Sequence, residues 1–222
     1  MLYHRLLPSG KRLGINNRFA SLNLKGEKGM KVKLIDCTTD AAFNISYAAR
    51  TCYNSNDKDD ISKRPIFIKG LIKRGHETPL EFAHTMWEFD GISRVCQNQI
   101  VRHRIASYCV LSERYVDVSQ LDCILPYNVL KEYEGAVDMV EQMKKVYKFL
   151  VNSGVPKEDA RMLLPQGLST RMCMDMNFRS LRHFLKLRLD RHAQWEIRQV
   201  SQEILNVCRD KWPWLVEDIS YV

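Results

Sequence analysis

Strand-like and helix-like segments alternate along residues 31–210, and this alternation constrains the fold more than any other feature of the sequence. Apolar residues recurring every three or four positions predict helices at 40–52, 62–74, 92–101, 128–152, 156–164, 178–189 and 193–210. Short runs bounded by polar residues predict strands at 31–38, 85–90, 115–118 and 170–176. Because some strands have only hairpin-scale spacing between them, an α+β fold is favoured over a regular βαβ array.

Several helix boundaries follow from single residues. Asp40 is placed to cap the helix over 40–52. Gly75 and Gly154 come directly after helical patterns, and Pro156 stands in the first turn of the next one. These residues predict where the chain changes direction.

Residues 1–29 have neither strand nor helix periodicity and are predicted to be a disordered or non-native extension of a single domain at 30–222. They contribute +5 of the net charge of +8, which leaves the domain only mildly basic. Lys25-Gly26-Glu27, before Met30, is what a purine-rich ribosome-binding sequence would encode, so we expect translation to start at Met30. A flexible basic arm and an organellar presequence are alternatives. The intact mass of the native protein tests this expectation, and a mass that includes residue 2 onward would rule it out.

The composition of the whole chain is that of an ordinary globular protein, with 45% hydrophobic and 27% charged residues. Apolar runs are too short to span a membrane, and no secretory signal pattern opens the chain. Seven cysteines without a CxxC pair favour a reducing compartment and predict neither a disulfide framework nor a metal site. A cytoplasmic protein without a membrane partner is the expectation.

The segment 99–115 concentrates the polar chemistry of the chain. Arg102, His103 and Arg104 follow an apolar helix, and Ser112 and Arg114 come shortly after. Guanidinium groups bind phosphate and planar carbonyl groups through paired hydrogen bonds, so this density of donors predicts an anionic ligand. A solvated basic turn is the alternative that charge alone leaves open.

A second group of candidate residues lies on the helix over 178–189. Leu181, Phe184 and Leu185 form its apolar stripe, and Arg188 continues that stripe. A cation at such a position needs a ligand or an internal partner, for which Asp190 and Glu196 are the nearest acidic residues.

These segments resemble the flavin-dependent thymidylate synthases, whose signature RHRx7S is matched by Arg102 to Ser112. The resemblance extends over nearly the whole chain from residue 31 and includes Ala49-Arg50, 75–79, 160–165 and 177–196. It implies a central, mainly antiparallel sheet flanked by helices, in a homotetramer with active sites at subunit interfaces.

The resemblance also implies roles for individual residues. Arg188 matches the catalytic arginine at the uracil carbonyl edge, where a guanidinium stabilises anionic charge on the ring. The nucleotide-binding positions are Gln99, Ile100, Val101, Arg102, Val110, Leu111, Ser112, Glu113, Arg114, Arg161 and Arg188. The flavin-binding positions are His76, Thr78, Arg102, His103, Arg104, Val110, Asn177, Phe178, Arg179, His183 and His192.

The implied reaction is methylation of dUMP to dTMP with 5,10-methylenetetrahydrofolate as carbon donor, FAD as cofactor and NADPH as reductant. Ser112 has no evident base at fixed spacing, so a hydrogen-bonding role is expected for it. Where many relatives have polar residues, this chain has Cys109 and Val110, and it has His183 where Asn is common. A related hydroxymethylation of the pyrimidine nucleotide is therefore an alternative. A nucleic-acid-binding protein is a weaker one, because no aromatic residues are interleaved with the arginines.

Overall fold

The computed structural model describes residues 21–23 and 29–220, so most of the predicted extension lies outside the described residues. Four antiparallel strands form the central sheet in the order β2-β3-β6-β4. Their bounds are β2 Lys31–Cys37, β3 His84–Ser93, β6 Ser169–Asn177 and β4 Ser107–Val110. The predicted α+β class and the antiparallel sheet are confirmed.

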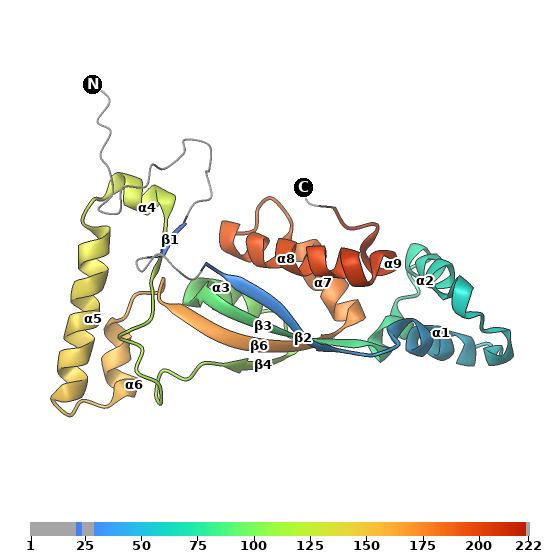
Figure 1. The fold of residues 1–222 in the computed structure, drawn as a ribbon, viewed down its shortest axis with the longest axis horizontal. Helices are drawn as coiled ribbons and strands as arrows, with labels where there is room; N and C mark the ends of the chain where they lie inside the picture. The colour runs from blue at the N-terminus through green and yellow to red at the C-terminus, as the bar shows by residue number, and fades with distance from the viewer. Residues whose placement is uncertain (1–20, 24–28, 221–222) are drawn as a thin grey trace, which may run out of the picture.

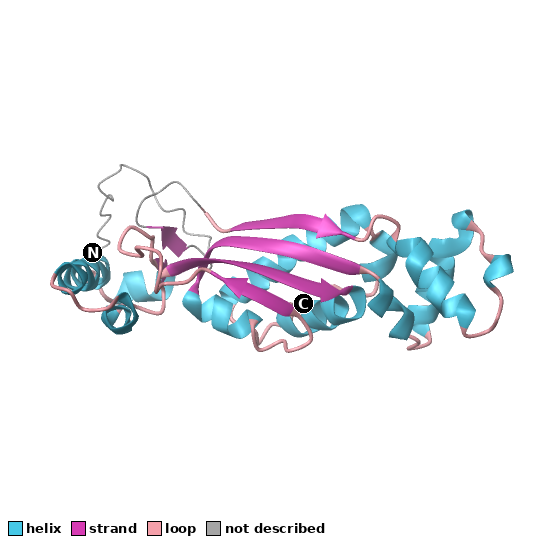
Figure 2. Ribbon diagram, turned by 90° about the horizontal axis from the view of Figure 1, so that it is seen from below, coloured by secondary structure: helices cyan, strands magenta, loops and turns pink. Residues whose placement is uncertain are grey.

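The two faces of the sheet differ in what covers them. Trp87, Phe89, Met172 and Met174 alternate with more exposed residues along β3 and β6 and are almost fully buried. They face helices α3 (Arg94–Ile100), α7 (Phe178–Arg188) and α8 (Trp195–Lys211), all on one side of the sheet (Figure 1). Seen from below, the strands lie in front of these helices, so no described helix covers the other face (Figure 2).

Helix α8 closes the core because its apolar residues recur at helical spacing. Ile197, Val200, Ile204 and Leu205 are fully buried in the same cluster as the sheet residues. Burial of each such side chain contributes about 1.5–3 kcal/mol. The short helix α9 (Pro213–Val216) then packs beside α7 and α8.

Smaller elements extend the molecule beyond both ends of the sheet (Figure 1). At one end lie α1 (Ala41–Thr51), α2 (Arg64–Lys73) and the 3-10 helices η1 (Asn56–Lys58), η2 (Ile61–Lys63) and η3 (Thr78–Phe82). At the other lie α4 (Tyr127–Glu132), α5 (Ala136–Asn152), α6 (Lys157–Ala160) and η4 (Arg161–Leu163). There β1 (Ser21–Asn23) pairs with β5 (Ile124–Pro126).

Most helix boundaries agree with the sequence predictions. The Asp40 carboxylate accepts a hydrogen bond from Phe43 N at 2.9 Å and caps α1 as expected. Gly75 and Gly154 follow α2 and α5 with φ values of 73° and 92°, which L-residues with side chains rarely adopt. None of the helices in the described part of the chain is long and apolar enough to cross a membrane.

Two predicted elements are wrong. Residues 115–118 form no strand, because the backbone N–H groups of Tyr115 and Val116 both donate to Ser112 O and close a turn. The helix predicted over 128–152 is two helices, α4 and α5. Tyr133 between them is extended, and the interruption ends at Gly135, a residue with low helix propensity.

Candidate active site

Arg188 is held where the ends of two helices meet. It is the last residue of α7, and its Nη2 donates a 2.8 Å hydrogen bond to the carbonyl of Gln99 near the end of α3. Its Nε is buried and has no hydrogen-bond partner among the described residues. A buried donor without a partner costs free energy, which a hydrogen bond to a ligand or to a neighbouring subunit would recover.

The acidic residues considered as partners for Arg188 are bonded elsewhere. Asp190 accepts a hydrogen bond from the His192 backbone N–H and lies 2.8 Å from His192 Nδ1, and these two contacts, the backbone one first, lower the pKa of its carboxyl group. Glu196 accepts hydrogen bonds from the backbone N–H and the hydroxyl of Ser93. The prediction of an internal ion pair for Arg188 with either residue is therefore not supported.

Glu196 fixes the start of α3. Ser93 caps this helix by accepting from Cys96 N at 3.0 Å, and it donates its own hydroxyl to the buried Glu196 carboxylate on α8. Burial raises the pKa of Glu196, and the two bonds from Ser93 oppose that rise. This contact ties α3, and with it Gln99, to the helix that follows Arg188 in the chain.

His103 occupies a buried position beside α7. Its Nε2 lies 2.6 Å from Ser180 Oγ, and because that hydroxyl donates to Ile105 O, it accepts from His103. Burial lowers the pKa of His103, as do the charges of His183 and Arg188, so the ring is neutral at pH 7. The His103 and His183 rings are 5.6 Å apart.

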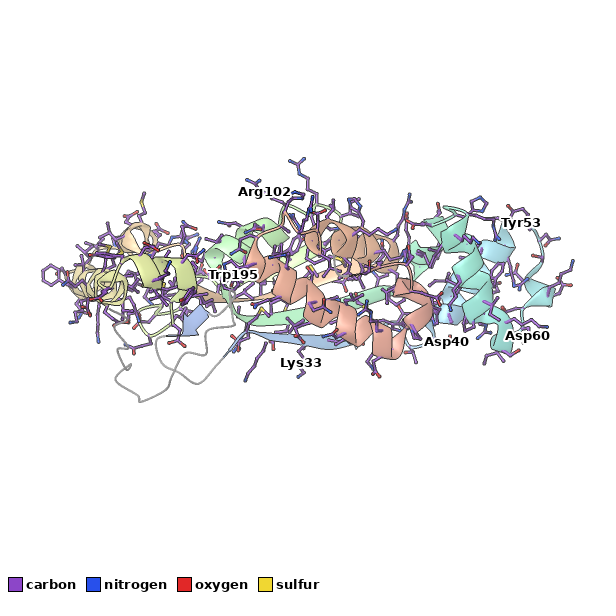
Figure 3. The ribbon with its side chains drawn as sticks, turned by 90° about the horizontal axis from the view of Figure 1, so that it is seen from above. Lys33, Asp40, Tyr53, Asp60, Arg102 and Trp195 are labelled. Atoms are coloured by element: carbon purple, nitrogen blue, oxygen red, sulfur yellow. The ribbon has the colours of Figure 1, made fainter. Side chains whose placement is uncertain are left out.

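The other predicted residues near α3 and α7 differ in how far their side chains are exposed to solvent. Arg102 points outward over the middle of the molecule (Figure 3). The exposed set comprises Arg102, Arg104, Val110 and His183, and Val101 and Gln99 are partly buried. Ile100 and Phe178 have fully buried side chains in the core. Asn177 caps α7 by accepting from Ser180 N at 2.8 Å.

A second group of predicted residues surrounds a cavity of about 210 Å³, lined by Arg94, Glu113, Arg161, Met162, Leu164 and Gln166. The buried Glu113 carboxylate pairs with Arg94 and lies 3.8 Å from Arg161. Arg114 pairs with Glu158 at 2.7 Å, with about half of each side chain exposed. Leu111 and Ser112, both partly buried, lead into this turn. The cations are thus paired with carboxylates that an anionic ligand could replace.

A third group lies at the end of the molecule formed by α1 and α2. His76 and Thr78 line a largely apolar cavity of about 820 Å³ together with aromatic side chains that include Phe43, Tyr47, Tyr53 and Phe82. Arg179, at the start of α7, pairs with Glu81 of η3 at 2.6 Å. The exposed His192 lies apart from this cavity, beside Asp190.

A single chain therefore brings the predicted residues together in three groups. Neither of the two cavities is lined by Arg104, Arg114 or Arg188. The sequence interpretation missed Arg94, although it precedes the 99–115 segment on the same helix. It also missed Ser93, whose signal was a serine at a helix start. Among the aromatic residues of the larger cavity, only Phe43 and Tyr47 have helical spacing, and the sequence interpretation did not single them out.

Comparisons with known proteins agree on one family. The family described as thymidylate synthase complementing protein matches residues 33–214. A protein of Geobacter sulfurreducens called flavin-dependent thymidylate synthase is 34% identical over 200 residues, covering 85% of this chain and 86% of its own. Proteins of the same name from Pyrococcus furiosus and Thermococcus kodakarensis are each 36% identical, over 189 and 196 residues. These alignments cover 79% and 81% of this chain and 78% of each relative.

Proposed function

The chain belongs to the flavin-dependent thymidylate synthase family, and we propose that it methylates dUMP to dTMP with 5,10-methylenetetrahydrofolate, FAD and NADPH. The observation that best supports this function is the environment of Arg188. Its guanidinium is anchored to Gln99 O, and its buried Nε has no hydrogen-bond partner among the described residues. Arg188 continues the buried stripe of α7 and is the family's position for contact with the uracil ring.

In this proposal the nucleotide is held by the arginine-rich segments. Arg114 and Arg161 bind its phosphate in place of Glu158 and Glu113, with Ser112 and the neighbouring backbone of 110–113 around it. The Arg188 guanidinium stabilises negative charge that develops on the pyrimidine during attack by C5. Residues 99–102, which include Gln99 and Arg102, are proposed to complete the nucleotide-binding site.

The residues present fit a flavin. A mainly apolar cavity of about 820 Å³ with aromatic walls and the polar groups of His76 and Thr78 is of the size and lining expected for a large cofactor. Arg102, His103, Arg104, Val110, Asn177, Phe178, Arg179, His183 and His192 are the further positions proposed to hold it. Bound FAD, reduced by NADPH, supplies the hydride that completes the methyl group.

A homotetramer with active sites at subunit interfaces accounts for the separation of the three groups. Arg114 and Arg188 lie in different groups of one chain, so a neighbouring subunit is proposed to complete each site. A cytoplasmic location belongs to the same proposal, since dUMP and folates are intracellular metabolites.

Purified protein is expected to be yellow, with the absorbance of an oxidised flavin, and to oxidise NADPH only when dUMP is present. Its product with methylenetetrahydrofolate should have the mass of dTMP. A product heavier by one oxygen would instead identify the hydroxymethylase, which the apolar Val110 and the thiol of Cys109 in the motif leave as a second candidate. Absence of flavin together with tight binding of nucleic acid would overturn the assignment.

A further inference from the structure

Cys109 and Cys173 lie directly opposite each other on neighbouring antiparallel strands. They are Cα partners in the register between β4 and β6, and both thiols are free. Cys109 is exposed and Cys173 is partly exposed. Since Met172 and Met174 point into the core, the two thiols project from the opposite face, which no described helix covers (Figure 2).

The register places the pair within reach of a covalent bond. Leu111 N donates to Arg171 O at 2.9 Å, so the Cys109–Cys173 pair two residues away is also of the hydrogen-bonded type. The Cα atoms of such a pair are about 5.5 Å apart, and disulfides span Cα separations of about 4.4–6.8 Å. The Cβ atoms of a hydrogen-bonded pair lie near the upper end of the usual range of about 4.5–5.5 Å, so they must approach by about 1 Å to reach the 3.5–4.5 Å of a disulfide. A disulfide here is therefore feasible and readily reduced.

We propose that Cys109 and Cys173 are a reversible redox pair, which a low-molecular-weight disulfide such as oxidised glutathione converts into a cross-strand disulfide. The more exposed Cys109 thiolate attacks one glutathione sulfur and releases the other half as a thiol. The Cys173 thiolate then attacks Cys109 Sγ and releases the second glutathione. Two protein thiols are oxidised, one small disulfide is reduced to two thiols, and each thiol proton passes to a released glutathione thiolate.

Formation of this disulfide would change the conformation of the segment from β4 to Arg114, which contains the end of the RHRx7S motif. β4 runs directly into Leu111, whose backbone N–H holds the turn before Arg114 to β6. Drawing the middle of β4 toward β6 shifts and stiffens that turn. Turnover is therefore expected to fall in the oxidised protein, a consequence that rests on the proposed function. Disulfides in reducing compartments are commonly transient and regulatory, as this one would be.

The other cysteines provide internal controls. Cys96, Cys123 and Cys208 are buried, and burial raises the pKa of each thiol, to about 11 for Cys123 and about 12 for Cys208. Cys37 on β2 faces Thr85 in register, and Cys52 follows α1 as its exposed C-cap residue. Cys52→Ser therefore removes an exposed thiol without touching the pair.

The test exposes the native full chain to oxidised glutathione and maps its peptides by mass. The expected result is loss of two hydrogens, a link between the Cys109 and Cys173 peptides, and reversal by dithiothreitol. Cys173→Ser should instead trap one glutathione on Cys109, and Cys52→Ser should form the link as the wild type does. A pair that stays reduced while Cys109 remains open to alkylation would overturn the proposal, as would a link joining two chains.

Activity is measured separately on the same samples. Oxidised wild-type protein should lose turnover several-fold and regain it on reduction with dithiothreitol. Equal turnover of the oxidised and reduced forms would contradict the effect on the motif. If reduced protein makes no dTMP, the proposed function fails, and the mass measurement still decides whether the redox pair exists.

Discussion

Replacing Arg188 with alanine is expected to lower kcat for dTMP formation by about 10²–10³-fold, the loss typical when one group that stabilises a developing anion is removed. The guanidinium is anchored to Gln99 O, so its charge is oriented before the nucleotide binds. The methyl group of alanine carries no charge that could take its place. Steady-state rates with saturating dUMP and methylenetetrahydrofolate measure the effect.

Lys186→Ala is the matched control, because it removes a cation from the same helix. Lys186 is half exposed and pairs with Asp218, on the side of α7 away from Gln99. Its turnover should stay close to that of the wild type. The Arg188 variant should keep its melting temperature within a few degrees and retain its flavin absorbance. Near-normal turnover in a folded Arg188→Ala protein would refute the catalytic role.

The sequence predicted the framework of the fold because local signals and tertiary structure agree there. Asp40 starts a helix through a hydrogen bond of its own carboxylate, and Gly75 and Gly154 end helices through their backbone conformations, so residues far away in the sequence matter little at these positions. Strand β4 was missed because only pairing with β6 makes Ser107–Val110 a strand. The break before α5 depended on Gly135, which a pattern of apolar residues does not register.

The sequence was sufficient to propose which residues belong to the candidate site, but it did not predict which of them contact each other. The stripe from Leu181 to Arg188 correctly placed a cation at the edge of the core, yet its partner is a carbonyl on another helix. Asp190 and Glu196 are close in sequence but bond to His192 and Ser93. Contacts between distant segments, such as Glu113 with Arg94, follow from the tertiary fold alone.

Replacing Asp218 with asparagine is expected to lower the free energy of unfolding by about 2 kcal/mol. Arg182 is 1% exposed and donates two hydrogen bonds, of 2.7 and 2.8 Å, to the Asp218 carboxylate. Losing one partner of a fully buried pair costs about 3–5 kcal/mol, and the half-exposed Asp218 side chain reduces that cost through solvent screening. Denaturant unfolding at pH 7 measures the difference. Glu217→Gln, which removes a neighbouring acid paired with Lys69 on the surface, should change stability by less than about 1 kcal/mol.

The same ion pair predicts how the difference between wild type and Asp218→Asn depends on pH. The hydrogen bonds and charge of Arg182 lower the pKa of Asp218 from 3.8 to about 2 in the folded protein. A carboxyl group with a lowered pKa stabilises the fold fully above its unfolded pKa and loses that contribution as the pH falls through its folded pKa. The difference in unfolding free energy should thus be constant above pH 3.8 and shrink toward pH 2. A difference that persists unchanged at pH 2 would show that the effect of the substitution does not come from the charge of the Asp218 carboxylate.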